Sequence, residues 1–283
     1  MKIALENAAL STRSRLFSGP EALLNDIRSG SRLLYGLGLA HFALALVFVP
    51  GLMLDERLIT GVNPWIKPFK FAVSIAIYLW TFAWVLNATG DLGRRRGLLV
   101  WTAAATMIVE MFVITLQPLR GTTSHYNIST PLNAVLWTAM GQAIAVNTLA
   151  NIYLLYLLTR RKFLKAQIAR EPLLAWGLRL GMFVFIVGAV EGGVMGAMAR
   201  HSIGVADGGP GLPLVNWSTR GGDLRIAHFL GIHAMQGIPL FAWLLHARGA
   251  RKAWPVFAFA GTWLGLTTAL FIQALMGRPL IAF

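Results

Sequence analysis

The chain has 283 residues, of which 56% are hydrophobic and only 13% are charged. A soluble globular protein carries roughly 25% charged residues, so a water-exposed surface of ordinary composition is excluded. The net charge of +14 comes from short basic clusters between apolar runs rather than from one basic domain, which excludes nucleic-acid binding as the function class. There are no cysteines, and this excludes disulfides, iron–sulfur clusters, thiolate haem ligation and cysteine zinc sites.

The first element in chain order is a polar and basic tail, residues 1–31, which we expect to be cytoplasmic. It lacks the apolar core and cleavage site of a secretory signal peptide. Within it, Ser18-Gly19-Pro20-Glu21 is typical of a capping box that opens a short helix through about Arg28. This helix would lie at the membrane interface, or the segment would be a partly ordered tail.

Residues 32–283 form one transmembrane domain in this interpretation. A membrane-spanning helix needs about 20 mostly apolar residues. Seven segments qualify, and we expect an all-α, polytopic bundle of seven transmembrane helices in a lipid bilayer. The expected segments are about 32–54, 66–88, 98–117, 131–158, 173–199, 224–246 and 254–277.

The distribution of Lys and Arg predicts the orientation of the bundle. The tail and the even-numbered loops carry twice as many Lys and Arg as the odd-numbered loops and the C-terminus. Because cytoplasmic loops are enriched in these residues, the topology is predicted to be N-in and C-out. A bacterial inner (plasma) membrane is the expected location.

Two loops on the predicted outer side are unusual. The third loop contains residues 118–127, and the fifth, about 200–223, is rich in glycine and proline, so it is not expected to form a regular element. It is interpreted either as a lid over the outer mouth or as a loosely ordered connector. Lys67 and Lys70 flank Pro68 at the start of the second segment, and they either anchor this helix at the headgroups or form a pocket for an anionic group.

Five ionisable side chains lie deep inside the apolar segments, away from their ends, where each costs roughly 2.5–3.5 kcal/mol on insertion scales. At about 1.5 Å per residue, all five are predicted to occupy one slab from the midplane outward. They are His41, Glu110, Glu191, His228 and His233. The inner half has amides and hydroxyls instead, including Asn87, Asn147, Thr148 and Asn151.

Local spacing refines this prediction. His228 and His233 are five residues apart, about 140° around a helix, so they do not share a face. Glu191 lies among Gly188, Gly192 and Gly196, a stripe of small residues that lets another helix approach closely.

Three hypotheses for function follow. In the first, His41, Glu110, Glu191, His228 and His233 bind an iron, zinc or copper ion, or His41 and His233 hold haem b. Glu110 and Glu191 would then be catalytic in a redox or hydrolytic reaction on a lipid-soluble substrate or other small molecule entering from the outer side. No H-x-x-x-H, H-E-x-x-H or E-x-x-H pair supports such a centre.

The second hypothesis is a proton-coupled transporter, since buried Glu and His residues are typical of proton relays. The third is a membrane sensor or scaffold without catalysis. A retinal protein is excluded because the last segment, 254–277, contains no lysine to form a Schiff base. The sequence leaves open whether the protein is an enzyme, and in which oligomeric state it exists.

Overall fold

The computed structural model describes residues 20–282, so Ser18 of the predicted capping box lies outside the described residues. Seven of its helices are long and apolar enough to cross a membrane, which makes the chain an integral, multi-pass membrane protein. These helices are α3 (Arg32–Leu54), α4 (Ile66–Asn87), α5 (Arg94–Leu119), α6 (Pro131–Thr159), α8 (Pro172–Met198), α9 (Leu224–Ala247) and α10 (Trp254–Leu275). Their bounds agree with the predicted segments to within four residues.

Polar caps fix where several of these helices begin. The Ser31 hydroxyl accepts a hydrogen bond from the Leu34 amide, Thr130 accepts one from Asn133, and Asp223 accepts one from Arg225. Such caps satisfy amide groups that have no partner inside the helix. The largest difference from the prediction is at α5, which begins four residues early because Arg94–Arg96 continue the helix beyond its apolar part.

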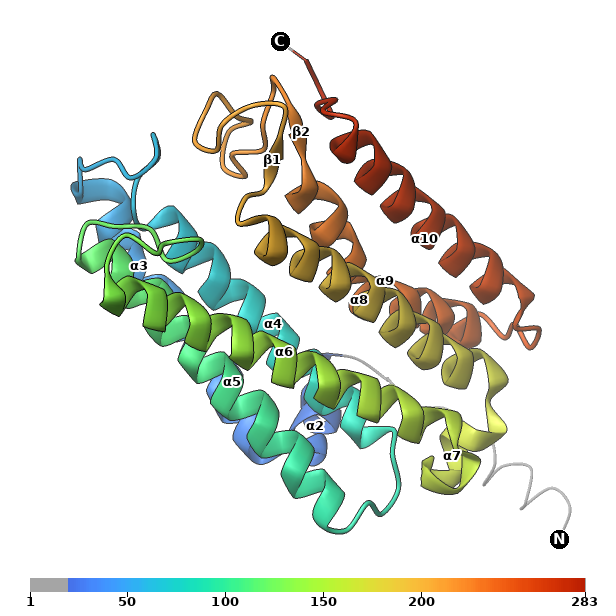
Figure 1. Ribbon diagram of the computed structural model, residues 1–283. Helices are drawn as coiled ribbons and strands as arrows, with labels where there is room; N and C mark the ends of the chain where they lie inside the picture. The colour runs from blue at the N-terminus through green and yellow to red at the C-terminus, as the bar shows by residue number, and fades with distance from the viewer. Residues whose placement is uncertain (1–19, 283) are drawn as a thin grey trace, which may run out of the picture.

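The helices form two groups that lie side by side (Figure 1). In the first, α4 packs against α3 and α5, and α5 packs against α6; in the second, α8, α9 and α10 pack against one another. Contacts between α6 and α8 join the groups.

The contact between α8 and α9 is a seam of small residues. A Cβ added to Gly188 would lie 2.6 Å from the carbonyl carbon of Gly231, and one added to Gly192 would lie 2.7 Å from the His228 ring. The predicted close approach is therefore present at Gly188 and Gly192. Gly196 differs, because no atom of the described residues lies within 4 Å of its added Cβ.

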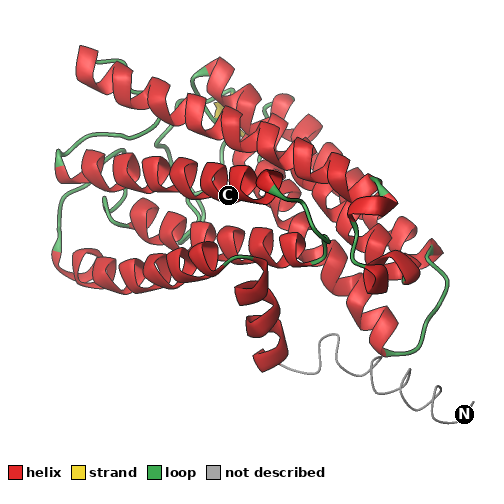
Figure 2. Ribbon diagram, turned by 90° about the horizontal axis from the view of Figure 1, so that it is seen from below, coloured by secondary structure: helices red, strands yellow, loops and turns green. Residues whose placement is uncertain are grey.

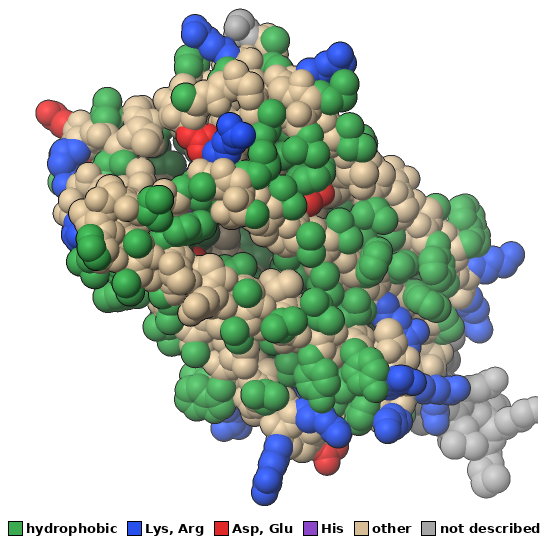
Figure 3. All heavy atoms as spheres, viewed as in Figure 1, with side chains coloured by type: hydrophobic (Ala, Val, Ile, Leu, Met, Phe, Trp, Pro, Cys, Tyr) green, Lys and Arg blue, Asp and Glu red, His purple; other side chains and the backbone are tan. Residues whose placement is uncertain are grey.

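The two ends of the bundle differ in their connections. We call the end that carries residues 55–65, 120–130 and 199–223 the long-loop end, and the opposite end the short-loop end. The long-loop end also holds the strands β1 (Ser202–Ile203) and β2 (Gly222–Asp223), which pair antiparallel within the fifth loop. In Figure 3, blue Lys and Arg side chains gather toward the two ends, and the flank between them is largely green. The charge distribution predicts that the long-loop end faces out of the cytoplasm.

Short helices complete the short-loop end: α2 (Pro20–Gly30), the 3-10 turn η1 (Arg161–Phe163) and α7 (Ala166–Arg170). Figure 2 shows α2 running across the direction of the long helices. It packs against α4, where the Asn87 side chain joins Asp26 and Lys165 at 2.9 and 2.7 Å. Burial raises the pKa of Asp26 despite the nearby Lys165.

Candidate functional site

A polar cluster lies at the long-loop end, where α4, α5 and α9 meet the third and fifth loops. We define it by its charged and histidine side chains: Lys67, Lys70, Glu110, His125, His201, Asp223, Arg225 and His228. Electrostatic interactions link these groups across five segments of the chain. The surface in Figure 3 is hollowed near this end.

The cations of the cluster come from α4 and α9. The Lys67 ammonium is half-buried, lies 5.8 Å from the Phe71 ring centre, and interacts electrostatically with Arg225, Lys70 and Glu110. It has no hydrogen-bond acceptor among residues 20–282. Lys70 differs, because its ammonium donates to the carbonyl oxygens of Leu214 and Val215 at 3.3 and 3.4 Å.

Arg225 and Asp223 fix the fifth loop to the start of α9. Asp223 is 1% exposed, and its carboxylate accepts from the Ser218 amide at 2.8 Å and from Arg225 Nε at 2.9 Å. Hydrogen bonds and charge from Arg225 hold the pKa of Asp223 below its usual value although burial opposes them. The guanidinium also donates to the Asn216 carbonyl oxygen. Asp223 is therefore paired with Arg225, and its charge also acts on Lys70.

The fifth loop reaches across the long-loop end to the first group of helices. Lys70 of α4 bonds to its residues 214 and 215, and a Cβ added to Gly208 would lie 3.2 Å from the Thr60 carbonyl oxygen in the first loop. Of the two interpretations of this loop, the contacts support the lid. Leu214 and Asn216 have positive φ angles of 66° and 54°, so their carbonyl positions depend on an uncommon backbone conformation.

The third loop places His125 in the cluster. The imidazole packs against Phe71 and Trp137, with ring centres 5.9 and 5.4 Å away. Asn127 stabilises the loop by donating to Thr122 Oγ1 at 2.8 Å and to the Thr123 carbonyl at 3.0 Å. Burial, followed by the charges of Lys67 and neighbouring histidines, holds the pKa of His125 well below its usual value.

His201 lies at the start of the fifth loop, beside Asp207. Its Nδ1 is 3.3 Å from Asp207 Oδ1, a contact that favours a charged imidazole. Burial and the charge of Arg225 outweigh this contact and lower the pKa of His201 to about 4. Both loop histidines are therefore neutral at pH 7 and add hydrogen-bonding groups without adding charge.

Glu110 is the acid of the cluster that has a free acceptor. It is 3% exposed, and its Oε1 has no hydrogen-bond partner among the described residues. The charge that acts on it is that of Lys67. The two side chains thus interact across α4 and α5, and no ion pair joins them among the described residues.

The five predicted site residues are distributed among different contacts. His228 lies in the cluster, where its Nδ1 is 2.7 Å from the Gly188 carbonyl. His233 lies one turn further along α9 and packs edge-on against Phe229, with ring centres 4.3 Å apart. Glu191 is buried on α8, and its Oε2 has no partner within residues 20–282.

His41 faces α4. It shares the buried face of α3 with Gly38, whose added Cβ would meet the Trp80 ring at 2.2 Å. Its Nδ1 is 2.8 Å from the Leu37 carbonyl, and its Nε2 has no partner in the described part of the chain.

The geometry gives no support to the predicted metal or haem centre. Over residues 20–282 there is no group of three or more His, Asp or Glu side chains that could hold a metal ion. A haem between His41 and His233 would need α3 to face α9, yet α3 packs against α2, α4 and α5, and α9 packs against α8 and α10.

The sequence interpretation gave too little weight to the cations. Lys67 and Lys70 were expected mainly as headgroup anchors, and the alternative of an anion pocket is the one that their contacts favour. The signal was the Lys-Pro-x-Lys spacing, which places two ammonium groups on the first turn of a helix after a proline-rich turn. His125, His201 and Arg225 lie in loops or at a helix start, where depth in the membrane does not distinguish them.

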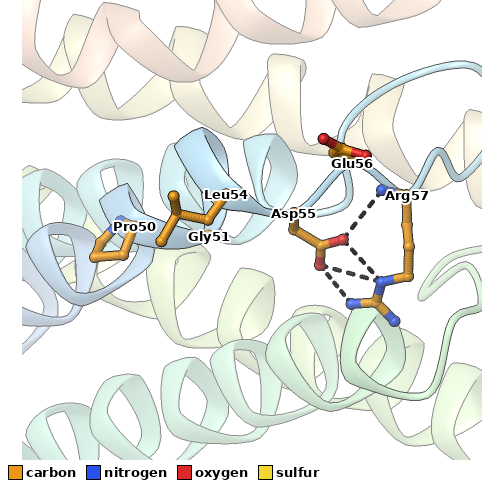
Figure 4. A pocket seen from close by; sticks show the side chains of 6 residues that line it. All are labelled: Pro50, Gly51, Leu54, Asp55, Glu56 and Arg57. Carbon is orange, nitrogen blue, oxygen red and sulfur yellow. Dashed lines mark hydrogen bonds and ion pairs between the residues drawn. The ribbon is translucent and has the colours of Figure 1, made fainter.

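A separate hollow of about 540 Å³ lies at the end of α3 (Figure 4). Its lining residues are Pro50, Gly51, Leu54, Asp55, Glu56 and Arg57. Arg57 Nε and Trp65 Nε1 donate to the Asp55 carboxylate at 2.9 and 2.8 Å, and hydrogen bonds from Arg57 hold the pKa of Asp55 well below its usual range. Asp55 and Arg57 satisfy each other, so the polar cluster is the better candidate.

Comparison with known proteins adds no family to this geometry: no family model, no curated protein and no solved structure matches the chain.

Proposed function

We propose that the polar cluster binds an anionic group, a carboxylate or a phosphate, of a small molecule or lipid that enters from the long-loop side. The observation that carries this proposal is the Lys67 ammonium, which is half-buried beside two further cations and has no acceptor among the described residues. An ammonium that is half-buried beside two further cations is disfavoured by their repulsion, and an anion would offset that cost. Lys and Arg are the usual donors to such groups.

The charges of the cluster favour an anion over a cation. Asp223 is bound to Arg225 and to the Ser218 amide, so it contributes little free negative charge. Two acids, Glu110 and Asp223, therefore oppose three cations, Lys67, Lys70 and Arg225. The neutral histidines supply hydrogen-bond donors around the same point.

The same geometry supports one specific form of the transport hypothesis. Glu110 has a free carboxyl oxygen beside Lys67, so an anion that displaces Glu110 from Lys67 would favour protonation of this carboxylate. Anion binding would then be coupled to uptake of a proton. A carrier of small anions and a receptor for them would share this step.

The test uses the purified full chain in detergent and follows ligand-dependent thermal stabilisation. The probes are decanoate, dodecyl phosphate and inorganic phosphate, with decanol as the neutral counterpart. We expect an anionic probe to stabilise the protein and Lys67→Gln to weaken that binding about 10- to 100-fold, the equivalent of one charge-assisted hydrogen bond of roughly 1.5–3 kcal/mol.

The matched control is Arg278→Gln, which removes an exposed cation at the same end of the bundle. It should leave binding unchanged. Equal losses in both variants, or no response of the native chain to any anion, would overturn the proposal. Preference for dodecyl phosphate over inorganic phosphate would identify the source of the anion as a lipid or other amphiphile.

A further inference from the structure

A ladder of polar side chains runs from the polar cluster into the middle of the first helix group. Thr106 lies four residues before Glu110 on α5, so the two share a face about 6 Å apart along the helix. The Thr106 hydroxyl lies 3.4 Å from Asn147 Oδ1 on α6. Both Thr106 and Asn147 are buried, so the ladder is enclosed by the helices rather than exposed to lipid.

The ladder continues through Tyr78 of α4. Its hydroxyl donates to Asn147 Oδ1 at 2.8 Å and accepts from Asn151 Nδ2 at 2.9 Å. Asn151 is fully buried, and its Oδ1 has no partner in the described part of the chain. The ladder therefore ends on a free acceptor.

A side branch reaches α9 from the next turn of α4. Thr81 follows Tyr78 by three residues, and its hydroxyl accepts from Gln236 Nε2 at 3.1 Å. The Gln236 side chain also bonds to His233 of α9. Together with Asn151, Glu110 thus makes two side chains along this path that present unpaired acceptor oxygens among the described residues.

Unpaired acceptors of this kind point to water. Leaving a buried acceptor without a hydrogen bond costs about 1–3 kcal/mol each. In folded proteins such groups are normally satisfied by ordered water, which donates the hydrogen that an acceptor lacks.

The path is closed beyond Asn151 by apolar side chains. The next turn of α6 contributes Leu154, Leu157 and Leu158, and the facing part of α4 contributes Phe82 and Leu86; all five are at most 1% exposed. These apolar side chains occupy the space beyond Asn151, so the ladder of polar side chains does not continue toward the short-loop end.

From this arrangement we infer that the polar cluster continues as a water-filled, dead-end passage from Glu110 to Asn151, closed by the leucines of α6. Water and protons from the long-loop side reach the middle of the bundle through it and go no further. This inference does not depend on which anion, if any, the cluster binds.

Single cysteines test the passage directly, because the native chain contains none. The probe is a methanethiosulfonate carrying a quaternary ammonium, which reacts with the thiolate and therefore needs water at the thiol. Burial in apolar surroundings raises a thiol pKa, and each unit lowers the thiolate fraction about tenfold. We expect Thr106→Cys, in full-length protein in nanodiscs, to react at least about tenfold faster than two controls.

The controls are Ala105→Cys, the exposed neighbour about 100° around α5, and Leu154→Cys, which lies in the apolar closure. A Thr106→Cys reaction as slow as both controls would overturn the inference, and so would a fast reaction of Leu154→Cys. Thr81→Cys on the side branch provides a second reporter where Thr106→Cys fails to fold.

The result of the cysteine experiment can be distinguished from the result of the anion-binding experiment. Lys67→Gln should weaken anion binding and leave the reactivity of Thr106→Cys unchanged. If Thr106→Cys is unreactive in a protein that still binds anions through Lys67, the inference of a water-filled passage is refuted and the anion proposal stands.

Discussion

Adding one methyl group to the α8–α9 seam should show how much the close packing of these helices, as distinct from helix propensity, contributes to stability. In Gly188→Ala the new Cβ would lie 2.6 Å from the carbonyl carbon of Gly231 and 2.7 Å from its Cα, which is closer than a real Cβ approaches backbone atoms. The contact is backbone on both sides, so relief requires the two helices to move apart. Overpacking of this kind costs typically about 1–3 kcal/mol.

The matched variant is Gly193→Ala on the same helix, where no described atom lies within 4 Å of the added Cβ. Both substitutions bring the same gain in helix propensity, up to about 1 kcal/mol. The difference between them therefore isolates the steric term. We expect Gly188→Ala to be the less stable of the two by about 1–3 kcal/mol.

The assay is thermal unfolding of both variants in the same detergent, monitored by far-ultraviolet circular dichroism. The two melting temperatures are then compared. Equal midpoints would show that the seam opens at no cost, and the assignment of α8 and α9 as a tightly packed pair would then be wrong.

Three further predictions concern the topology and the long-loop end. For topology, Ile281→Cys should react with an impermeant maleimide added to intact cells, whereas Arg251→Cys should react only after lysis; the reverse pattern would refute the N-in orientation. Asp223→Asn should lower the unfolding free energy by about 1–3 kcal/mol because it replaces the carboxylate that pairs with Arg225 by a neutral amide and leaves the Ser218 and Arg225 N–H groups with a weaker acceptor, and an unchanged melting temperature would contradict this. His201 has a folded pKa of about 4, so the folded state binds fewer protons than the unfolded state between roughly pH 6.5 and 4, and stability should fall as the pH is lowered through that window, by a total on the order of 3 kcal/mol. His201→Gln should flatten this pH dependence of the melting temperature, while His246→Gln at the opposite end should leave it steep.

Hydropathy predicted the helices well because the bilayer imposes one length and one composition on every span. The helix bounds follow from that constraint, and the early start of α5 follows from a polar extension that apolarity does not register. The lid-like fifth loop was foreseen only as an alternative, since its position depends on long-range bonds such as Lys70 to Leu214.

The site was harder to predict because residue counting along a helix gives depth but not direction. His41 has the expected type for a site residue, yet it faces α4, and Glu191 lies buried on α8 without a charged partner among the described residues. Lys67 was more informative than these residues. The sequence does not show this, because the interactions of Lys67 with Glu110 and Arg225 depend on the fold.

The polar cluster takes its parts from both helix groups: Lys67 and Glu110 belong to the first, and Arg225 belongs to the second, which the glycine seam makes a single stiff unit. An anion held by the two cations, Lys67 and Arg225, would link the two groups across the boundary between them. The affinity for the anion would then depend on the relative position of the two groups. A force that slides one group past the other would release the anion. Because the site is divided between the two helix groups, the fraction of protein with bound ligand and the relative position of the groups would be thermodynamically linked.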